Sequence, residues 1–200
     1  MPDFLNPQVI IPIVGLVGVA IIVFAEAGFL FGIFLPGDSL IFTASIFAAQ
    51  GYFRIETLVI VALISTILGD QTGYYLGKKF GSKIFHKEES LLFKKSYIDK
   101  TKKFFDKYGK KAVLICRFIP IVRTFIPTMA GISGMQYRDF VKYNILGAIM
   151  WISVFCTLGY FLGNIIGKNP QILGLITITI IVVSIFSGMF MVWQHNKTHK

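Results

Sequence analysis

Four charged side chains lie in segments that are otherwise almost entirely apolar: Glu26, Asp38, Arg117 and Arg123. A charge at the centre of a membrane helix costs roughly 2.5–3.5 kcal/mol on insertion scales, so all four left in lipid would cost on the order of 10 kcal/mol. We therefore expect these charges to face one another or water. Arginine binds phosphate or carboxylate through a planar fork and stays charged when partly desolvated. The pattern predicts a buried site for an anionic ligand, with purely structural salt bridges as the alternative.

The composition places these charges in a membrane protein. Of the 200 residues, 54% are hydrophobic and only 15% are charged, which is far from a typical soluble domain. Uncharged runs cover 4–25, 143–167 and 169–196, each long enough for the roughly 20 residues that cross a bilayer as a helix. We read the first as a retained span, because no basic residue precedes it as in a signal peptide. A fourth predicted span, about 57–77, contains Asp70.

Two further apolar segments, 27–51 and 112–134, contain prolines that should break a helix. Pro36 is followed by Gly37 in the first segment, and the second contains Pro120 and Pro127. Proline removes a backbone donor and clashes with the preceding turn, so neither segment should be one continuous helix. Irregular backbone at membrane depth persists only where protein or water surrounds it. Both segments are therefore candidates for re-entrant hairpins, with kinked full spans as the alternative.

One pattern occurs twice along the chain. Phe-Leu-Pro at 34–36 precedes Gly-Tyr-Tyr-Leu-Gly at 73–77, and Phe-Ile-Pro at 118–120 precedes Gly-Tyr-Phe-Leu-Gly at 159–163. Duplicated units of this kind are typical of transporters, although chance similarity can also produce Gly and Pro coincidences. We predict a single all-α membrane domain over 1–200, built as an inverted repeat of a re-entrant helical hairpin plus a transmembrane helix. The repeat units are about 26–77 and 112–167, with further transmembrane helices at the N-terminus and at about 171–193.

The charge distribution predicts the orientation. Lysines far outnumber acidic residues in the loop 78–111, and short lysine-rich loops stay cytoplasmic. Four spans and two non-crossing hairpins put this loop and both termini on the cytoplasmic side. If both hairpins were instead full spans, the loop and the tail would stay cytoplasmic and only the N-terminus would move outside. The charge distribution therefore favours non-crossing hairpins only weakly. The loop lacks arginine and any nucleic-acid-binding motif, and residues 97–107 fit a helix on the anionic inner membrane surface.

The remaining features favour helix packing. Glycines recur every fourth residue at 69–77 and 159–167, which lets neighbouring helices approach closely. Asp70 lies among them and is either a polar partner of Gln71 and Asn144 or an additional member of the functional cluster formed by the four charged residues. Cys116 and Cys156 have no metal-ligand or redox spacing, so we expect neither a metal nor a cofactor.

The motifs together resemble one family. They are Glu26, the run FLPGDSL at 34–40, GDQTGY at 69–74, Tyr-Gly at 108–109, RFIPIVRTFIP at 117–127, Ala-Gly at 130–131 and NILGAIMW at 144–151. Over about 10–195, the chain resembles the bacterial DedA family within the SNARE-associated, VTT-domain superfamily. The resemblance implies an inverted pair of re-entrant-hairpin units and transport of polyisoprenyl phosphate or phospholipid, coupled to protons in several members. Its eukaryotic relatives are lipid scramblases.

The resemblance assigns the family's acidic pair to Glu26 and Asp38 and its arginine pair to Arg117 and Arg123. We therefore expect a flippase for undecaprenyl phosphate in the bacterial plasma membrane, in which the arginines bind phosphate and the acidic pair exchanges protons. Its partners would be membrane lipids and protons, and not nucleic acid. A passive phospholipid scramblase is the first alternative. An intramembrane lipid phosphatase is less favoured, because the histidines lie only in the basic loop and the tail, at His86, His195 and His199.

Overall fold

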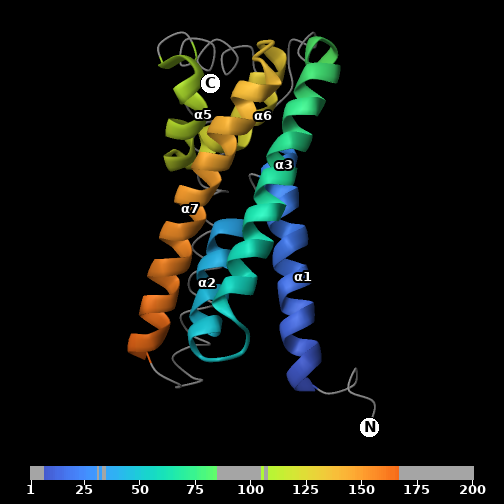
Figure 1. Ribbon diagram of the computed structural model, residues 1–200. Helices are drawn as coiled ribbons and strands as arrows, with labels where there is room; N and C mark the ends of the chain where they lie inside the picture. The colour runs from blue at the N-terminus through green and yellow to red at the C-terminus, as the bar shows by residue number, and fades with distance from the viewer. Residues whose placement is uncertain (1–6, 31, 33–34, 85–104, 106–107, 167–200) are drawn as a thin grey trace, which may run out of the picture. The chain divides into compact units, whose positions relative to one another are not determined.

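The computed structural model describes residues 7–30, 32, 35–84, 105 and 108–166, and these form helices without any β-strand (Figure 1). The all-α prediction is therefore confirmed for the described part of the chain. The α-helices are α1 (Pro7–Gly28), α2 (Gly37–Ala49), α3 (Ile55–Ile84), α5 (Ala112–Ile115), α6 (Pro120–Ile132) and α7 (Tyr137–Ile166). Two short 3₁₀ helices, η3 (Gly109–Lys111) and η4 (Cys116–Phe118), flank α5.

Two of these helices have the length and composition of membrane spans. They are Ile55–Phe80 within α3 and Tyr137–Ile166, which is the whole of α7. α1 covers most of the predicted first span, and Gly15–Gly28 within it and α2 are shorter apolar helices. The predicted surface helix at 97–107, apart from residue 105, and the predicted span at 171–193 lie outside the described residues.

Both proline-containing segments are discontinuous, as the sequence predicts. α1 ends at Gly28 and α2 begins directly after Pro36. In the second segment, Ile119 has extended backbone (φ −115°, ψ 104°) between η4 and α6, and Pro120 begins α6. The ring of a proline disfavours helical backbone at the preceding residue and is tolerated in the first turn of a helix. Pro127, in contrast, lies inside α6.

The chain divides into two compact units. Unit 1 comprises Met1–Val23, Ile33–Ile64 and Ile152–Lys200, and unit 2 comprises Phe24–Gly32 and Ser65–Trp151. Each unit therefore draws on both halves of the sequence, and α1, α3 and α7 contribute residues to both.

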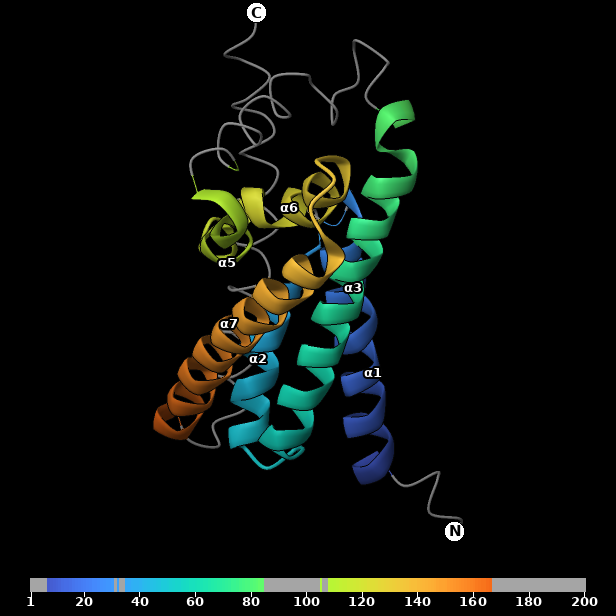
Figure 2. The same cartoon turned by 45° about the horizontal axis from the view of Figure 1, so that its top comes forward.

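In unit 1, the C-terminal part of α7 packs against α2 (Figure 2). A Cβ atom at Gly163 would come within 2.7 Å of the Ala49 Cβ and 2.8 Å of the Ile46 carbonyl oxygen. Gln50, which follows α2, donates from Nε2 to the Gly163 carbonyl oxygen over 2.5 Å. The contact between these helices depends on small residues, and it confirms the predicted packing role of the glycine stripe for its described part.

In unit 2, a glycine face of α3 receives α6 and the end of α1. Gly77 lies against the Thr128 backbone, and a Cβ at Gly69 would lie 2.6 Å from the Phe24 carbonyl oxygen. Beside this face is an apolar core that includes Tyr74 and Phe140, whose rings stack with centroids 4.7 Å apart. The Tyr74 hydroxyl donates to the Met135 carbonyl oxygen over 2.5 Å. These contacts fix α3, α6 and the start of α7, which carry Asp70, Arg123 and Asn144, described below.

Candidate functional site

Arg117 is a buried arginine held by two other buried polar side chains. It lies in η4, and its Nη2 donates hydrogen bonds to Asp70 Oδ2 on α3 and to Asn144 Oδ1 on α7. The Arg117 side chain is 8% exposed and that of Asp70 is 6% exposed. Since an unpaired buried charge is strongly unfavourable, the carboxylate balances the guanidinium charge where solvent cannot. The structure places Asp70 beside both Arg117 and Asn144, so a functional role for Asp70 stays a prediction.

Gly147 provides the space that the Arg117 side chain occupies. A Cβ atom at this position would lie 2.7 Å from Arg117 Cδ and 2.8 Å from Arg117 Nε. Gly147 is three residues after Asn144, so both lie on the same face of α7. The helix thus presents a hydrogen-bond acceptor to the arginine and, one turn later, a gap for its side chain.

Two hydrogen-bond donors in this cluster lack a partner. Arg117 Nε and Asn144 Nδ2 are buried nitrogen atoms without a hydrogen bond of normal geometry. The Asn144 amide lies near enough to the Asp70 carboxylate for a weak hydrogen bond, but this contact falls outside normal hydrogen-bond geometry. Buried donors are normally satisfied, and leaving one unpaired costs about 1–3 kcal/mol. The cluster therefore has capacity for a further acceptor.

Arg123 forms the second ion pair, with Glu26. Arg123 lies in the first turn of α6, and its Nη2 donates to Glu26 Oε1 in the last turn of α1. The two side chains are 14% and 12% exposed, so this pair is slightly more accessible than that of Arg117. The guanidinium carbon also lies 5.4 Å from the ring centre of Trp151, within the range of a cation–π contact.

Asp38, the fourth predicted charge, belongs to unit 1. It lies in the first turn of α2, where the positive end of the helix dipole favours a carboxylate. Glu26, Asp70, Arg117 and Arg123 all belong to unit 2. The structure thus brings Glu26 to Arg123, whereas the meeting of Asp38 with the arginines stays a prediction.

Sequence reasoning missed two neighbours of the arginines. They are Gly147 and Trp151, which the sequence analysis includes only as part of the motif at 144–151, although both contact an arginine side chain. Asn144, Gly147 and Trp151 have the i, i+3, i+7 spacing of one helix face. That spacing within the motif at 144–151 is the signal that could have identified them.

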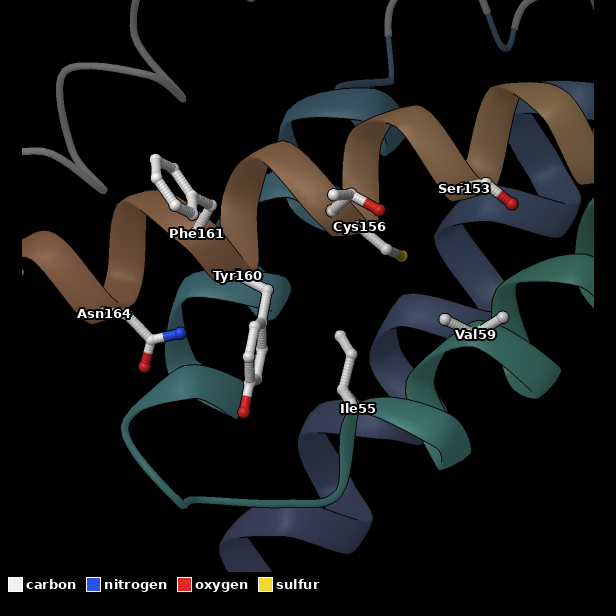
Figure 3. A pocket seen from close by; sticks show the side chains of 8 residues that line it. Ile55, Val59, Ser153, Cys156, Tyr160, Phe161 and Asn164 are labelled. Carbon is white, nitrogen blue, oxygen red and sulfur yellow. The ribbon is translucent and has the colours of Figure 1, made fainter.

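Outside the charged cluster, unit 1 contains an open pocket of about 440 Å³ between α3 and α7 (Figure 3). Ile55 and Val59 of α3 line one side, and α7 contributes polar groups such as Ser153, Tyr160 and Asn164. None of the predicted site residues lines it. Among the described residues, no group of three or more His, Cys, Asp or Glu side chains could hold a metal ion.

These features define a helical membrane protein whose apolar helices bury two arginine–carboxylate pairs. The VTT domain family matches residues 11–161, and the chain belongs to this family and to its DedA group of bacterial membrane proteins. Protein DedA of Escherichia coli is 41% identical over 88% of the chain and 81% of its own length. An uncharacterized membrane protein of Mycobacterium tuberculosis is 40% identical over 94% and 86%, respectively.

Inner membrane protein YqjA of Escherichia coli is 28% identical over 87% of the chain and 82% of its own length. No solved structure matches the chain. The relatives' names support a bacterial inner-membrane location for this protein.

Proposed function

We propose that this protein translocates a phosphate-headed polyisoprenoid lipid, undecaprenyl phosphate, across the bacterial inner membrane. The observation that carries the proposal is the burial of Arg117 and Arg123 in an apolar helical unit, where each forms an ion pair with a carboxylate. Buried ion pairs are weak sources of stability, because desolvation offsets much of their attraction. A site that must receive an anionic headgroup gives a reason to keep two guanidinium groups there.

The two arginines would bind the phosphate of the cargo. A guanidinium fork matches phosphate oxygens in pairs and holds its charge in a dry site, which a lysine ammonium does less well. Because Glu26 pairs with Arg123, it would have to release that arginine before phosphate binds. Protonation of Glu26, and of Asp38 as the second acidic group, would favour this release and couple transport to the proton gradient.

The transport path would use the two proline-broken segments as re-entrant hairpins of an inverted repeat. The helix breaks before α2 and at Ile119 support this, because discontinuous helices expose backbone groups where a ligand can approach. Both termini and the lysine-rich loop would be cytoplasmic. The two hairpins would exchange roles during transport, so that the phosphate-binding site opens in turn to each side of the membrane.

A passive phospholipid scramblase would use the same buried charges without proton coupling. An intramembrane phosphatase is the other alternative, and it requires a nucleophile or general base beside the bound phosphate. The carboxylates beside the arginines, those of Asp70 and Glu26, are engaged in ion pairs. The thiol of Cys116 is buried and donates a hydrogen bond to the Val113 carbonyl oxygen over 3.2 Å. We therefore favour binding and transport over hydrolysis.

A leaflet-exchange assay in proteoliposomes tests the proposed function. Exchange of undecaprenyl phosphate, undecaprenol and phosphatidylglycerol would be compared, with release of inorganic phosphate measured in parallel. We expect exchange of undecaprenyl phosphate to exceed that of both other lipids, without phosphate release. Equal exchange of the phospholipid would favour the scramblase, and phosphate release would favour the phosphatase.

A further inference from the structure

We propose that Asp70, Arg117 and Asn144 form an anion-exchange site, in which the Asp70 carboxylate holds Arg117 until a phosphate oxygen of the cargo replaces it. This inference rests on the proposed function for the identity of the cargo. It adds Asn144 as a phosphate-binding residue and Asp70 as the internal competitor, roles that sequence reasoning did not assign to either side chain.

Charge balance is the first argument for exchange. The Asp70–Arg117 pair is neutral and more than nine-tenths buried on both sides. Adding a phosphate to this neutral pair would leave a net negative charge in a dry site, which is strongly unfavourable. Replacing the Asp70 carboxylate with phosphate at Arg117 keeps an anion beside the guanidinium. A phosphate can therefore bind here only if Asp70 withdraws or becomes neutral.

The unpaired donors are the second argument. Arg117 Nε, with one N–H group, and Asn144 Nδ2, with two, make no hydrogen bond of normal geometry, and Asn144 is only 1% exposed. A carboxylate has two oxygen atoms, and Asp70 receives one Arg117 hydrogen bond through Oδ2. A phosphate headgroup presents more acceptor oxygens than a carboxylate and can bond both donors as well as Arg117 Nη2. The donor set thus fits phosphate better than the carboxylate that occupies it.

The location of the residues is the third argument. Asp70 lies on α3, Arg117 on η4 and Asn144 on α7, so three separate elements of unit 2 converge on one guanidinium. Gly147 leaves room for the Arg117 side chain to pack against α7, which brings its guanidinium to Asn144. A salt bridge that only joined α3 to η4 would not need the Asn144 amide.

The test is equilibrium binding of radiolabelled undecaprenyl phosphate to the full chain in detergent micelles. Asp70→Asn keeps a hydrogen-bond acceptor for Arg117 but removes the competing charge, so affinity should rise about tenfold. Asn144→Asp replaces the amide donor with a second carboxylate, so affinity should fall about tenfold or more. Asn144→Leu, which removes the donor without adding charge, should also weaken binding.

The matched control is Asn164→Asp, which adds the same charge to the part of α7 in unit 1. Asn164 is exposed, and exposed charges interact weakly, so this variant should change the affinity less than about twofold. Undecaprenol measures binding that does not involve the phosphate, and no variant should change it. If Asp70→Asn does not yield folded protein, the comparison of Asn144→Leu with wild type decides: unchanged affinity would overturn the role of the amide.

The outcomes separate this inference from the proposed function. Tighter binding by Asp70→Asn with weaker binding by both Asn144 variants would support the exchange site. Weaker binding by Asp70→Asn would overturn the exchange site, because Asp70 would then only position Arg117. The proposed transport of undecaprenyl phosphate would not be affected by that result. If inorganic phosphate binds in the expected order of variants and the lipid does not bind, the anion site is supported and the lipid cargo is overturned.

Discussion

At the scale of single residues, the two buried arginines of unit 2, Arg117 and Arg123, each form an ion pair with a carboxylate. Arg117 pairs with Asp70 and Arg123 pairs with Glu26, so each positive charge is balanced locally. A buried arginine without such a partner would be far less favourable than the observed pairs. The carboxylates are therefore part of any binding event, because a phosphate that approaches an arginine must compete with the carboxylate already bound there.

Neutral substitutions of Glu26 and Asp38 test whether these carboxylates couple transport to protons. Glu26→Gln and Asp38→Asn imitate permanently protonated side chains, so both variants should retain binding of undecaprenyl phosphate. Wild-type exchange should accelerate under an imposed pH gradient in proteoliposomes, whereas the variants should not respond. Glu56→Gln is the control, because Glu56 forms an exposed pair with Arg54, 64% and 82% exposed, respectively. A gradient response in both acidic variants would assign these residues a structural role only.

At the scale of elements, glycines set how closely the helices approach. The Cβ that an alanine would add at Gly77 meets backbone atoms of Thr128, so α3 or α6 would have to move to accommodate it. A Cβ at Gly131 would likewise meet the Tyr74 backbone oxygen. These contacts hold α6, which carries Arg123, against α3, which carries Asp70.

Replacement of glycine by alanine distinguishes these positions from open ones. Gly77→Ala should destabilise the protein by about 1–3 kcal/mol, the usual cost of overpacking a tight contact. Gly18→Ala in α1 should be neutral or stabilising by up to about 1 kcal/mol, because alanine favours helix and, outside the local backbone of α1, no described residue has an atom within 4 Å of the added Cβ. Thermal unfolding in detergent measures both. A Gly77→Ala variant as stable as Gly18→Ala would show that the α3–α6 contact is not tight.

The helices and their breaks could be predicted from the sequence, but the pairing of side chains could not. Apolar length and proline placement are local properties, and they gave α3, α7 and the breaks before Gly37 and Pro120. The choice between Asp70 and Asp38 as the partner of Arg117 depends on which helix faces η4, and residue spacing within one helix does not contain that information. For this reason the sequence alone does not decide between the two roles of Asp70.

At the scale of the whole molecule, the distribution of lysine predicts how the chain is oriented in the membrane. The loop 78–111 is strongly basic, and the tail adds Lys197 and Lys200. The anionic cytoplasmic leaflet attracts such segments by about 1 kcal/mol per charge. Both the loop and the tail should therefore lie on the cytoplasmic side.

Cysteine accessibility tests this orientation. In a background without Cys116 and Cys156, a membrane-impermeant thiol reagent should not label Lys95→Cys in sealed cells but should label it after permeabilisation. A cysteine at Asn169, in the short link after α7, should be labelled from outside and serves as the positive control. Labelling of Lys95→Cys in sealed cells would reverse the predicted orientation.

The most direct test of the account is the rate of undecaprenyl phosphate exchange by Arg117→Lys and Arg123→Lys in proteoliposomes. Both variants keep the positive charge but lose the planar fork, so each should slow exchange by about tenfold or more, the loss expected for one charged hydrogen bond. The folded fraction, measured by thermal unfolding, should fall much less than the rate. If both lysine variants exchange the lipid at the wild-type rate, the arginines do not bind the phosphate and the account is wrong.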